Sequence, residues 1–295
     1  MERRKFIKAG GIFAAALPLN SLKAFKIDPM IENYQKLCST CGTQFPINST
    51  VEICSICAEE RQYIPITGQS WTTHRELLKN HTTKVVQINK NLYEIVIEPT
   101  FAIGQRAFLV ISESGNVLWD CIPLLDEKTI NFIQSKGGLK AIAFSHPHYY
   151  SNMNDWASTF NCQIYIHKKD ASYIVDNGEH VILWEGNENP LWDDLKLVNI
   201  GGHFDGSSVI MIPSMSKNGT MLCGDTMYLS LSKKHFAIMY SYPNRIPLPI
   251  SEIKRIKNRL TEISFDTVYG FYSYQNVSGN AKDILTASFE KYLRE

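Results

Sequence analysis

Three apolar segments of this sequence end at side chains of the kind that bind metal ions. These side chains are His146, His148, His203 and Asp225. The third histidine and the aspartate both sit beside glycines, which let the backbone approach a ligand closely. Loops at the carboxyl ends of strands are where α/β folds place their sites. A lone His-x-His pair is weak evidence, but three such strand ends predict one shared metal site, and neutral imidazoles favour zinc there.

From about residue 83 the chain alternates between predicted strands and helices. Two β-hairpins are expected first, at 84–99 and 108–124. Further strands are predicted at 139–145, 163–170, 195–202, 207–213 and 220–225. Helices are predicted at 126–138, 151–159, 170–178, 250–263 and 278–295. Ile250, Ile253, Ile256 and Leu260 fall on one face of the fourth helix. Hairpins followed by this alternation indicate a layered α/β domain.

Residues 33–75 contain a compact cysteine module ahead of that domain. Its two C-x-x-C pairs are Cys38 with Cys41 and Cys54 with Cys57. Four thiolates at this spacing are typical of a tetrahedral zinc site that leaves no open position, so the predicted ion is structural. Gly42 lets the chain turn beneath the metal. The alternative is a pair of disulfides, which an exported protein would permit.

The first 25 residues have the pattern of an export signal. Basic residues precede a short apolar segment, and a cleavage after Ala24 would follow. The stretch R-R-K-F-I-K resembles a twin-arginine signal, whose pathway carries folded proteins, so metal loading would precede export to the periplasm. The sequence departs from that signal at Glu2, and the alternative is an ordinary charged start of a cytoplasmic protein.

The composition and charge of the chain limit the kinds of molecule that it is expected to bind. The chain has 295 residues, 44% of them hydrophobic, and a formal net charge of +1. This length suits one large domain with a small appendage. The near-neutral charge and the lack of a long basic run do not favour nucleic acid. The sequence contains no stretch of about 20 uncharged apolar residues, so no integral membrane segment is predicted. A small-molecule substrate is therefore expected.

The motifs of residues 80–295 resemble those of the metallo-β-lactamase superfamily. The family motif H-x-H-x-D-H corresponds to residues 146–151, G-H-T-P-G-S to 202–207, and G-D-T to 224–226. The resemblance implies a four-layered αββα sandwich with metals between its two sheets. The cysteine module lies outside the part that this resemblance covers.

The departures from the family pattern affect its second metal. Tyr150 and Ser151 stand where the family has an aspartate and a histidine, and Phe271 stands where a late histidine is usual. The resemblance thus implies that the ligands of the second metal are missing. His146, His148 and His203 remain for one metal, with Asp225 within reach.

A single imidazole-bound metal is sufficient for hydrolysis, since it can lower the pKa of bound water to about 7. We therefore expect a metal-dependent hydrolase of a small ester, amide or lactone. Asp225 is the first candidate to orient the water, although it could merely complete the coordination. Tyr150 could donate to a developing oxyanion or simply fill the space of the second metal. His235, with Tyr242 and Arg245, is expected along the cleft, unless it is a surface histidine.

Alternatives remain open at this stage. The metal at the histidines could be iron rather than zinc. The chain could also be a non-hydrolytic metal-binding or partner-binding protein, or a mononuclear iron oxidoreductase, on the same scaffold.

Overall fold

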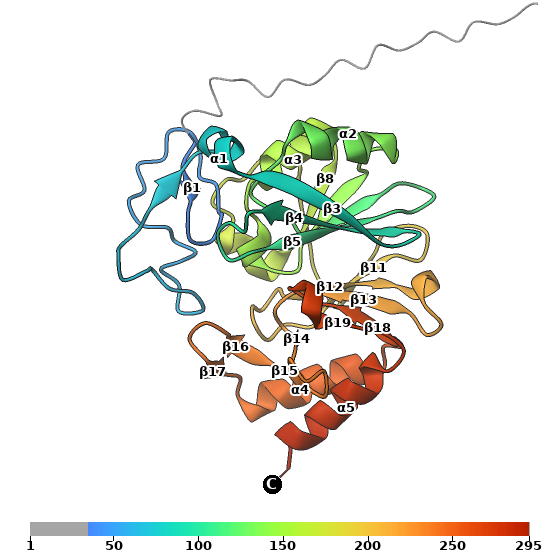
Figure 1. Cartoon of the computed structure of the whole chain (residues 1–295). Coiled ribbons are helices and arrows are strands. Elements are labelled where there is room, and N and C mark those ends of the chain that lie inside the picture. Colours follow the sequence, from blue (N-terminus) through green and yellow to red (C-terminus); the bar gives the residue numbers. More distant parts are fainter. Residues whose placement is uncertain (1–34, 295) are drawn as a thin grey trace, which may run out of the picture.

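Two mixed β-sheets face each other and carry helices on their outer sides, as Figure 1 shows. The computed structural model describes residues 35–294. The first sheet has seven strands in sequence order, antiparallel from β3 to β6 and parallel from β6 to β9. These strands are β3 (Thr82–Asn89), β4 (Leu92–Glu98), β5 (Arg106–Val110), β6 (Val117–Trp119), β7 (Ala141–Ala143), β8 (Gln163–His167) and β9 (Val181–Trp184).

The second sheet has six strands in the order β10-β11-β12-β13-β18-β19. They are β10 (Glu188–Pro190), β11 (Lys196–Asn199), β12 (Ser208–Ile212), β13 (Thr220–Cys223), β18 (Thr267–Tyr269) and β19 (Asn276–Val277). Two short ribbons lie between β13 and the next helix in the chain. They are formed by β14 (Tyr228–Leu229) with β15 (Phe236–Ala237) and by β16 (Met239–Ser241) with β17 (Ile246–Pro247).

The outer layers consist of helices that bury one apolar face each. The helices are α1 (His74–Asn80), α2 (Glu127–Ser135), α3 (Met153–Phe160), α4 (Ile250–Thr261) and α5 (Ala281–Tyr292). Four 3₁₀ turns are η1 (Pro147–Tyr149), η2 (Lys168–Tyr173), η3 (Pro213–Met215) and η4 (Ser273–Gln275). Ile133 of α2 and Trp156 of α3 lie in the core behind the first sheet, and Ile256 of α4 and Leu285 of α5 lie in the core behind the second.

A third apolar core fills the space between the sheets. Phe108 and Trp119 from the first sheet meet Ile210 and Leu222 from the second in one buried cluster. The order of layers is therefore helix, sheet, sheet, helix, and the predicted four-layered α/β sandwich is confirmed. This packing brings the carboxyl ends of β7 and β13, which belong to different sheets, next to each other.

The cysteine module lies at one side of the sandwich (Figure 1). Its short strands β1 (Leu37–Cys38) and β2 (Trp71–Thr72) pair antiparallel, and the four cysteines form a small buried cluster with Phe45 and Ile56. The rings of Phe45 and Trp71 meet edge to face at 5.3 Å. The predicted export signal lies outside the described residues. Within residues 35–294, no helix has the length and apolar character needed to cross a bilayer.

Most predicted elements are confirmed, and two details are wrong. The helix start at Asp126 is confirmed, because its carboxylate accepts from Thr129 N and caps α2. The helix predicted at 170–178 is instead the 3₁₀ turn η2, which ends at Tyr173. There the Asp170 carboxylate accepts from Gly206 N (2.7 Å), so a contact distant in sequence replaces helix capping. Ile250 is 51% exposed because it is the first residue of α4 and lies beyond the buried face.

Candidate metal centre

The four side chains predicted from the strand ends converge on one point. His146 follows β7, His148 lies in η1, His203 follows β11 and Asp225 follows β13, and one ligand atom from each lies within 4.8 Å of all the others. Asp225 Oδ2 is 3.6 Å from His146 Nε2 and 3.9 Å from His203 Nε2. His203 Nε2 is 3.2 Å from His148 Nδ1. A tetrahedron with zinc–ligand distances of 2.0–2.2 Å has edges of about 3.3–3.6 Å, so the quartet has the size that one such ion requires.

Hydrogen bonds fix two of the imidazoles in the orientation that ligands need. His146 Nδ1 lies 2.8 Å from Ser145 Oγ, which donates to Asp120 (2.9 Å), while Ser145 N donates to the same carboxylate (2.7 Å). With its Nδ1–H donated to Ser145, His146 keeps a lone pair on Nε2, a buried atom without a hydrogen-bond partner. His203 Nδ1 similarly donates to Tyr240 O (2.6 Å). A ring that donates one N–H and directs its other nitrogen into the site is the usual arrangement of a metal-binding histidine.

Burial also keeps two of the imidazoles neutral. Desolvation, followed by the nearby His146, lowers the pKa of His203 to about 3 and that of His148 well below its usual range. Desolvation likewise raises the pKa of the Asp120 carboxyl well above its usual range, against the two hydrogen bonds from Ser145. Neutral imidazoles offer the lone pairs that a borderline cation binds.

Aromatic rings lie beside His146. The ring of Tyr149 lies 5.2 Å from that of His146, and Phe271 lies 5.4 Å from Tyr149. Among the described residues, the only groups with metal-binding geometry are this quartet and the four cysteines. The structure thus brings together one imidazole-based ligand set, as the sequence predicted.

Tyr150 points away from the quartet. Its ring packs against Phe144 (5.1 Å) in the core behind the first sheet, and Asp170 is the charge that most affects its pKa, which burial raises. A 3₁₀ turn advances about 120° per residue, so the adjacent tyrosines of this segment face different sides. Tyr149, which the sequence analysis did not consider, is the tyrosine that contacts the histidines.

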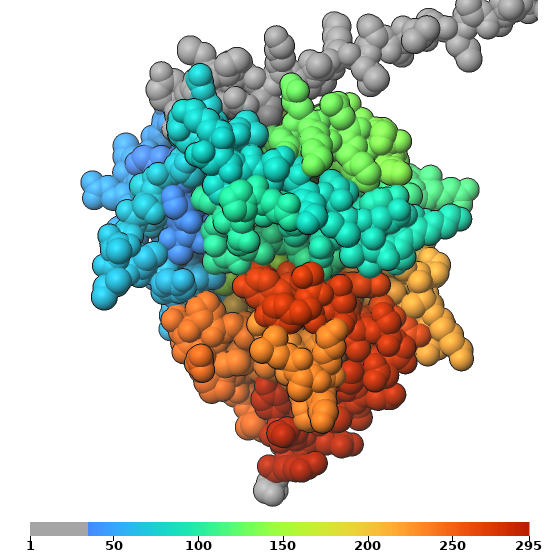
Figure 2. All heavy atoms as spheres, in the orientation of Figure 1, coloured from blue at the N-terminus to red at the C-terminus, as the bar shows by residue number. Residues whose placement is uncertain are grey.

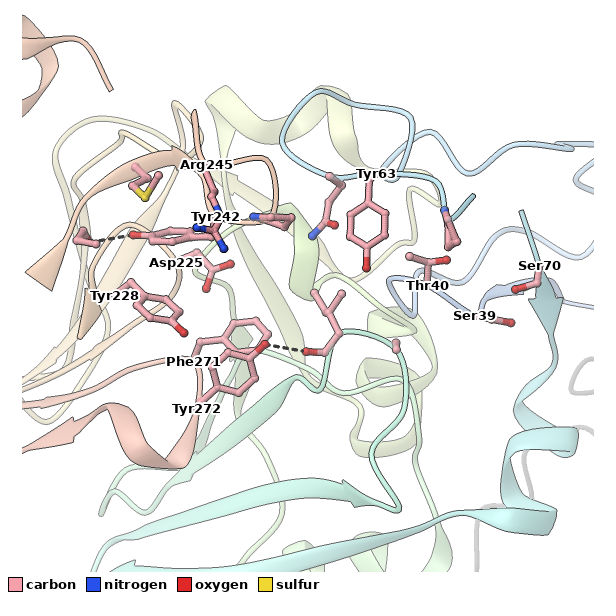
Figure 3. Close-up of a pocket in the computed structure, with 17 residues that line it drawn as sticks. Ser39, Thr40, Tyr63, Ser70, Asp225, Tyr228, Tyr242, Arg245, Phe271 and Tyr272 are labelled. Atoms are coloured by element: carbon pink, nitrogen blue, oxygen red, sulfur yellow. Dashed lines mark hydrogen bonds between the residues drawn. The ribbon is translucent and has the colours of Figure 1, made fainter. Parts of the chain in front are cut away.

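A pocket of about 860 Å³ opens at Asp225, the only member of the quartet that lines it (Figure 3). Tyr228, Tyr242, Phe271 and Tyr272 form an aromatic wall. The hydroxyls of this wall are occupied: Tyr242 donates to Ala237 O (2.9 Å), Tyr272 donates to Ile103 O (3.3 Å), and Tyr228 pairs with the hydroxyl of Tyr274. The wall therefore offers ring surface and hydroxyl oxygens that can still accept a hydrogen bond.

The opposite wall of the pocket comes from the cysteine module. The contributing residues are Ser39, Thr40, Gln62, Tyr63, Pro65 and Ser70. Figure 3 shows Tyr63 and Thr40 on one side of the pocket, facing Tyr242 and Arg245 on the other. The predicted placement of Tyr242 and Arg245 along the cleft agrees with this arrangement. His235 does not reach the pocket, because it lines a separate hollow with Phe236, Ser288 and Lys291.

The four cysteines form a second metal-binding group. Cys38 Sγ is 3.7 Å from Cys57 Sγ, and Cys41 Sγ is 3.6 Å from Cys54 Sγ. A disulfide would require about 2.05 Å. A tetrahedron with zinc–sulfur distances of 2.3 Å has edges of about 3.8 Å, which agrees with the observed spacing. Contact with Cys41 lowers the pKa of Cys38, and the same contact raises the pKa of the buried Cys41, so the sulfurs cannot all ionise without a cation.

Side chains tie the module to the first histidine motif. Gln105 Nε2 donates both to Cys41 O (2.5 Å) and to His148 O (3.2 Å). Gln44 N donates to Ser151 O (3.1 Å). The spacing of the cysteines does not predict which surface of the sandwich the module covers. Asp120 was not among the predicted site residues, although it follows β6 directly and so carries the same strand-end signal as the four ligands.

Comparison with known proteins identifies one relative by sequence and several by structure. No family model matches the chain. The uncharacterized protein YmaE of Bacillus subtilis (strain 168) is 38% identical over 266 residues, which cover 88% of this chain and 95% of YmaE. This match is longer than residues 80–295, so it extends into the segment that precedes the sandwich.

Solved structures of metallo-β-lactamases share the fold. The crystal structure of VMB-1 superposes with a TM-score of 0.52 at 16% sequence identity, and the match covers 72% of this chain and 96% of VMB-1. The metallo-β-lactamase DIM-1 superposes with a TM-score of 0.52 at 14% identity, and the match covers 71% of this chain and 97% of DIM-1. The metallo-β-lactamase FIM-1 from Pseudomonas aeruginosa, in its mono-zinc form, superposes with a TM-score of 0.51 at 12% identity. The match covers 72% of this chain and 97% of FIM-1. At these identities the likeness establishes the fold alone.

Proposed function

The chain belongs to the same family as YmaE and has the metallo-β-lactamase fold, and on this premise we propose that it is a metal-dependent hydrolase of a small ester, amide or lactone. The observation that carries the proposal is the placement of the ligand quartet. Three buried imidazoles lie behind one carboxylate, and that carboxylate lines a pocket large enough for a small molecule.

The three imidazoles of the quartet would hold one ion, with Asp225 beside it and one position left for water, and zinc is the metal we propose. Bound there, zinc would supply a water of lowered pKa and an electrophile for a substrate carbonyl. His146 and His203 each have their Nδ1–H engaged, by Ser145 and Tyr240 O respectively, so their rings cannot rotate freely. This preorganisation is the contribution of the chain itself.

In this proposal Asp225 acts on the attacking water. Its side chain is 14% exposed and lies between the imidazoles and the pocket. A carboxylate at this point can accept a hydrogen bond from water, orient one lone pair toward a substrate and receive the proton. Tyr150 has no such role in this proposal, because its ring lies in the core, and neither has His235, which lies in a separate hollow.

The pocket walls favour a substrate with an apolar or aromatic body. The rings of Tyr228 and Tyr242 stack at 4.9 Å, and Tyr272 and Tyr274 stack at 5.3 Å. Because Tyr242 and Tyr272 donate their hydroxyl protons to backbone carbonyls, this wall would bind ligands through ring surface and through hydroxyl oxygens that accept. We therefore propose aryl or arylalkyl esters and lactones as the first substrates to test.

The test is hydrolysis of an aryl ester, lactone, amide, thioester and phosphoester panel by the full chain loaded with zinc or with iron. The double variant His146→Ala, His148→Ala should lose at least about 100-fold in kcat/KM, because it removes two metal ligands. His180→Ala is the matched control, since His180 is not part of the quartet. Hydrolysis of any substrate at an equal rate by the wild type and the double variant would refute the assignment of that activity to this site.

A further inference from the structure

Arg61 connects the cysteine module to the histidine site. The residue belongs to the module segment but is only 8% exposed, and its Nε donates to the carbonyl oxygen of His203. Its guanidinium lies between two rings, 4.3 Å from the centre of Phe204 and 4.0 Å from that of Tyr240. A planar cation between two ring faces is held by cation–π attraction as well as by its hydrogen bond.

Tyr240 and Phe204, whose rings lie on either side of the guanidinium, are also neighbours of His203. Tyr240 supplies the carbonyl that accepts from His203 Nδ1 (2.6 Å), and Phe204 is the next residue after the histidine. The Phe204 ring also lies 5.8 Å from His146 in a stacked arrangement. Arg61 therefore contacts three groups: the backbone of His203, Tyr240, which orients the His203 ring, and the Phe204 ring, which packs beside the imidazoles.

The module and the β16–β17 ribbon together hold Arg61 in place. Cys57, one of the four sulfur ligands, lies four residues earlier in the chain. Glu59 forms an ion pair with the guanidinium, and Arg61 O accepts from Ser241 Oγ (2.9 Å). Asn244 Nδ2 donates to the carbonyls on both sides of Arg61, at 2.8 Å each. Figure 2 shows the module, in blue, directly against the orange part of the chain that carries these partners.

From this geometry we infer that Arg61 is a positioning residue for the histidine site, and that the metal affinity of that site depends through Arg61 on the folded cysteine module. The inference goes beyond the proposed function, since it concerns how the quartet is held and stands whether or not the site hydrolyses a substrate. A purely structural role would differ: Arg61 would then stabilise the docking of the module without changing the affinity of the quartet for metal.

The experiment measures cobalt and zinc affinity at the histidine site of the full chain by competition with a chromogenic chelator. Cobalt bound to imidazole and carboxylate is distinguished by its absorption from cobalt bound to thiolates, so the two groups are followed separately. Arg61→Met should weaken binding at the histidine site by about 10–100-fold, the usual effect of removing a residue that orients a metal ligand. It should also shift the visible bands of cobalt bound there.

Two further variants separate positioning from general stability. Arg61→Lys keeps the charge but loses the planar fork, so binding should again be weaker than in the wild type. Arg259→Met is the matched control: Arg259 also donates to backbone carbonyls, of Asn187 and Asn199, but does not touch the quartet or the residues that orient it. This control should lose stability and retain the metal affinity of the wild type.

A double-mutant cycle tests the dependence on the module. Cys57→Ser should lower the metal affinity of the histidine site. In the Arg61→Met background the same change should lower that affinity little further, because the contacts of Arg61 with His203 are already absent. Full additivity of the two losses would overturn the route through Arg61. The inference as a whole fails if folded Arg61→Met, or folded Arg61→Lys where Arg61→Met does not fold, binds cobalt at the histidine site with unchanged affinity.

Discussion

A short chain of hydrogen bonds determines how His146 presents itself to a metal. Asp120 accepts from both the amide and the hydroxyl of Ser145, and this hydroxyl is then oriented to accept from His146 Nδ1. Asp120 has a positive φ of 64°, a conformation that aspartate tolerates better than most residues. The backbone at the end of β6 therefore directs the Asp120 carboxylate toward Ser145 at the end of β7. His146 Nε2, which has no hydrogen-bond partner, then faces the other ligand atoms.

Removing the Ser145 hydroxyl tests this chain of hydrogen bonds. Ser145→Ala should weaken metal binding at the quartet by about 10–100-fold, because His146 loses the acceptor that fixes its tautomer. The measurement is cobalt affinity by chelator competition. Ser288→Ala is a suitable control, since Ser288 is equally buried and hydrogen bonded but lies against β15. An unchanged affinity in Ser145→Ala would show that His146 is held by packing alone.

At the scale of elements, the site depends on the close approach of two strand ends from different sheets. Gly224 follows β13, and a Cβ built there would lie 2.3 Å from Ser145 Oγ and 2.7 Å from His146 Nδ1. Its φ is not in the left-handed region, so the requirement for glycine is one of space alone. The glycine of the G-D-T motif thus allows Asp225 to reach the histidines that follow β7.

Gly224→Ala should therefore push the two strand ends apart. We expect a loss of about 1–3 kcal/mol in the free energy of unfolding from overpacking, together with weaker metal binding at the quartet. Chemical denaturation and cobalt titration measure the two effects. Gly178→Ala serves as the control, because the three atoms nearest to its new methyl group all belong to the side chain of Asn154, which is not part of the quartet. Equal metal affinity in Gly224→Ala and the wild type would contradict the close-approach argument.

The turn η2 supports the glycine-rich segment that carries His203. Asp170 accepts from Gly206 N (2.7 Å), and burial raises the pKa of this carboxyl from 3.8 to about 7. The nearby charges act in opposite directions, since Asp205 raises this pKa while Arg61 and Lys169 lower it. A raised acid pKa means that the folded state holds its proton more tightly than the unfolded state. Stability is then lost as the pH rises from about 4 to 7 and is constant above that range.

Asp170→Asn should abolish this pH dependence. The amide oxygen can still accept from Gly206 N, and no charge needs to be buried. At pH 8 the variant should be more stable than the wild type by up to about 4 kcal/mol, the free energy that corresponds to a pKa raised from 3.8 to about 7. At pH 4 the two should be nearly equal. Urea unfolding of both proteins at both pH values measures the difference, and a stability gain in the variant that is the same at pH 8 as at pH 4 would contradict the burial of a charge here.

At the scale of the whole molecule, the sequence predicts the sandwich because its signals are local. Apolar runs, caps such as Asp126 and the glycines after strands all act within a few residues, and the positions of His146, His203 and Asp225 follow once each strand end is located. The helix predicted at 170–178 was wrong because a distant amide, Gly206 N, binds the side chain of Asp170.

The parts of the site that the sequence did not predict depend on contacts distant along the chain. Arg61 meets His203 across 142 positions, and Asn244 meets Glu60 across 184. No local pattern marks such pairs. Nor does the sequence show which of two adjacent tyrosines faces the histidines, since this depends on the 3₁₀ geometry at Tyr149. The module was recognised as a metal group but not as a wall of the pocket.

The two metal groups differ in exposure, and this leads to a prediction about metal removal. The four cysteines are at most 1% exposed, whereas Asp225 faces the pocket with 14% of its side chain accessible. A small chelator such as dipicolinate can approach the quartet through the pocket, but it can reach the sulfurs only when the module opens. The fully loaded chain should hold two ions, one in each group. Chelation should remove the imidazole-bound ion first, and a mercurial that modifies the thiols should release the second. Release of both ions in one step, or of the thiolate-bound ion first, would show that the module opens more readily than the pocket admits the chelator.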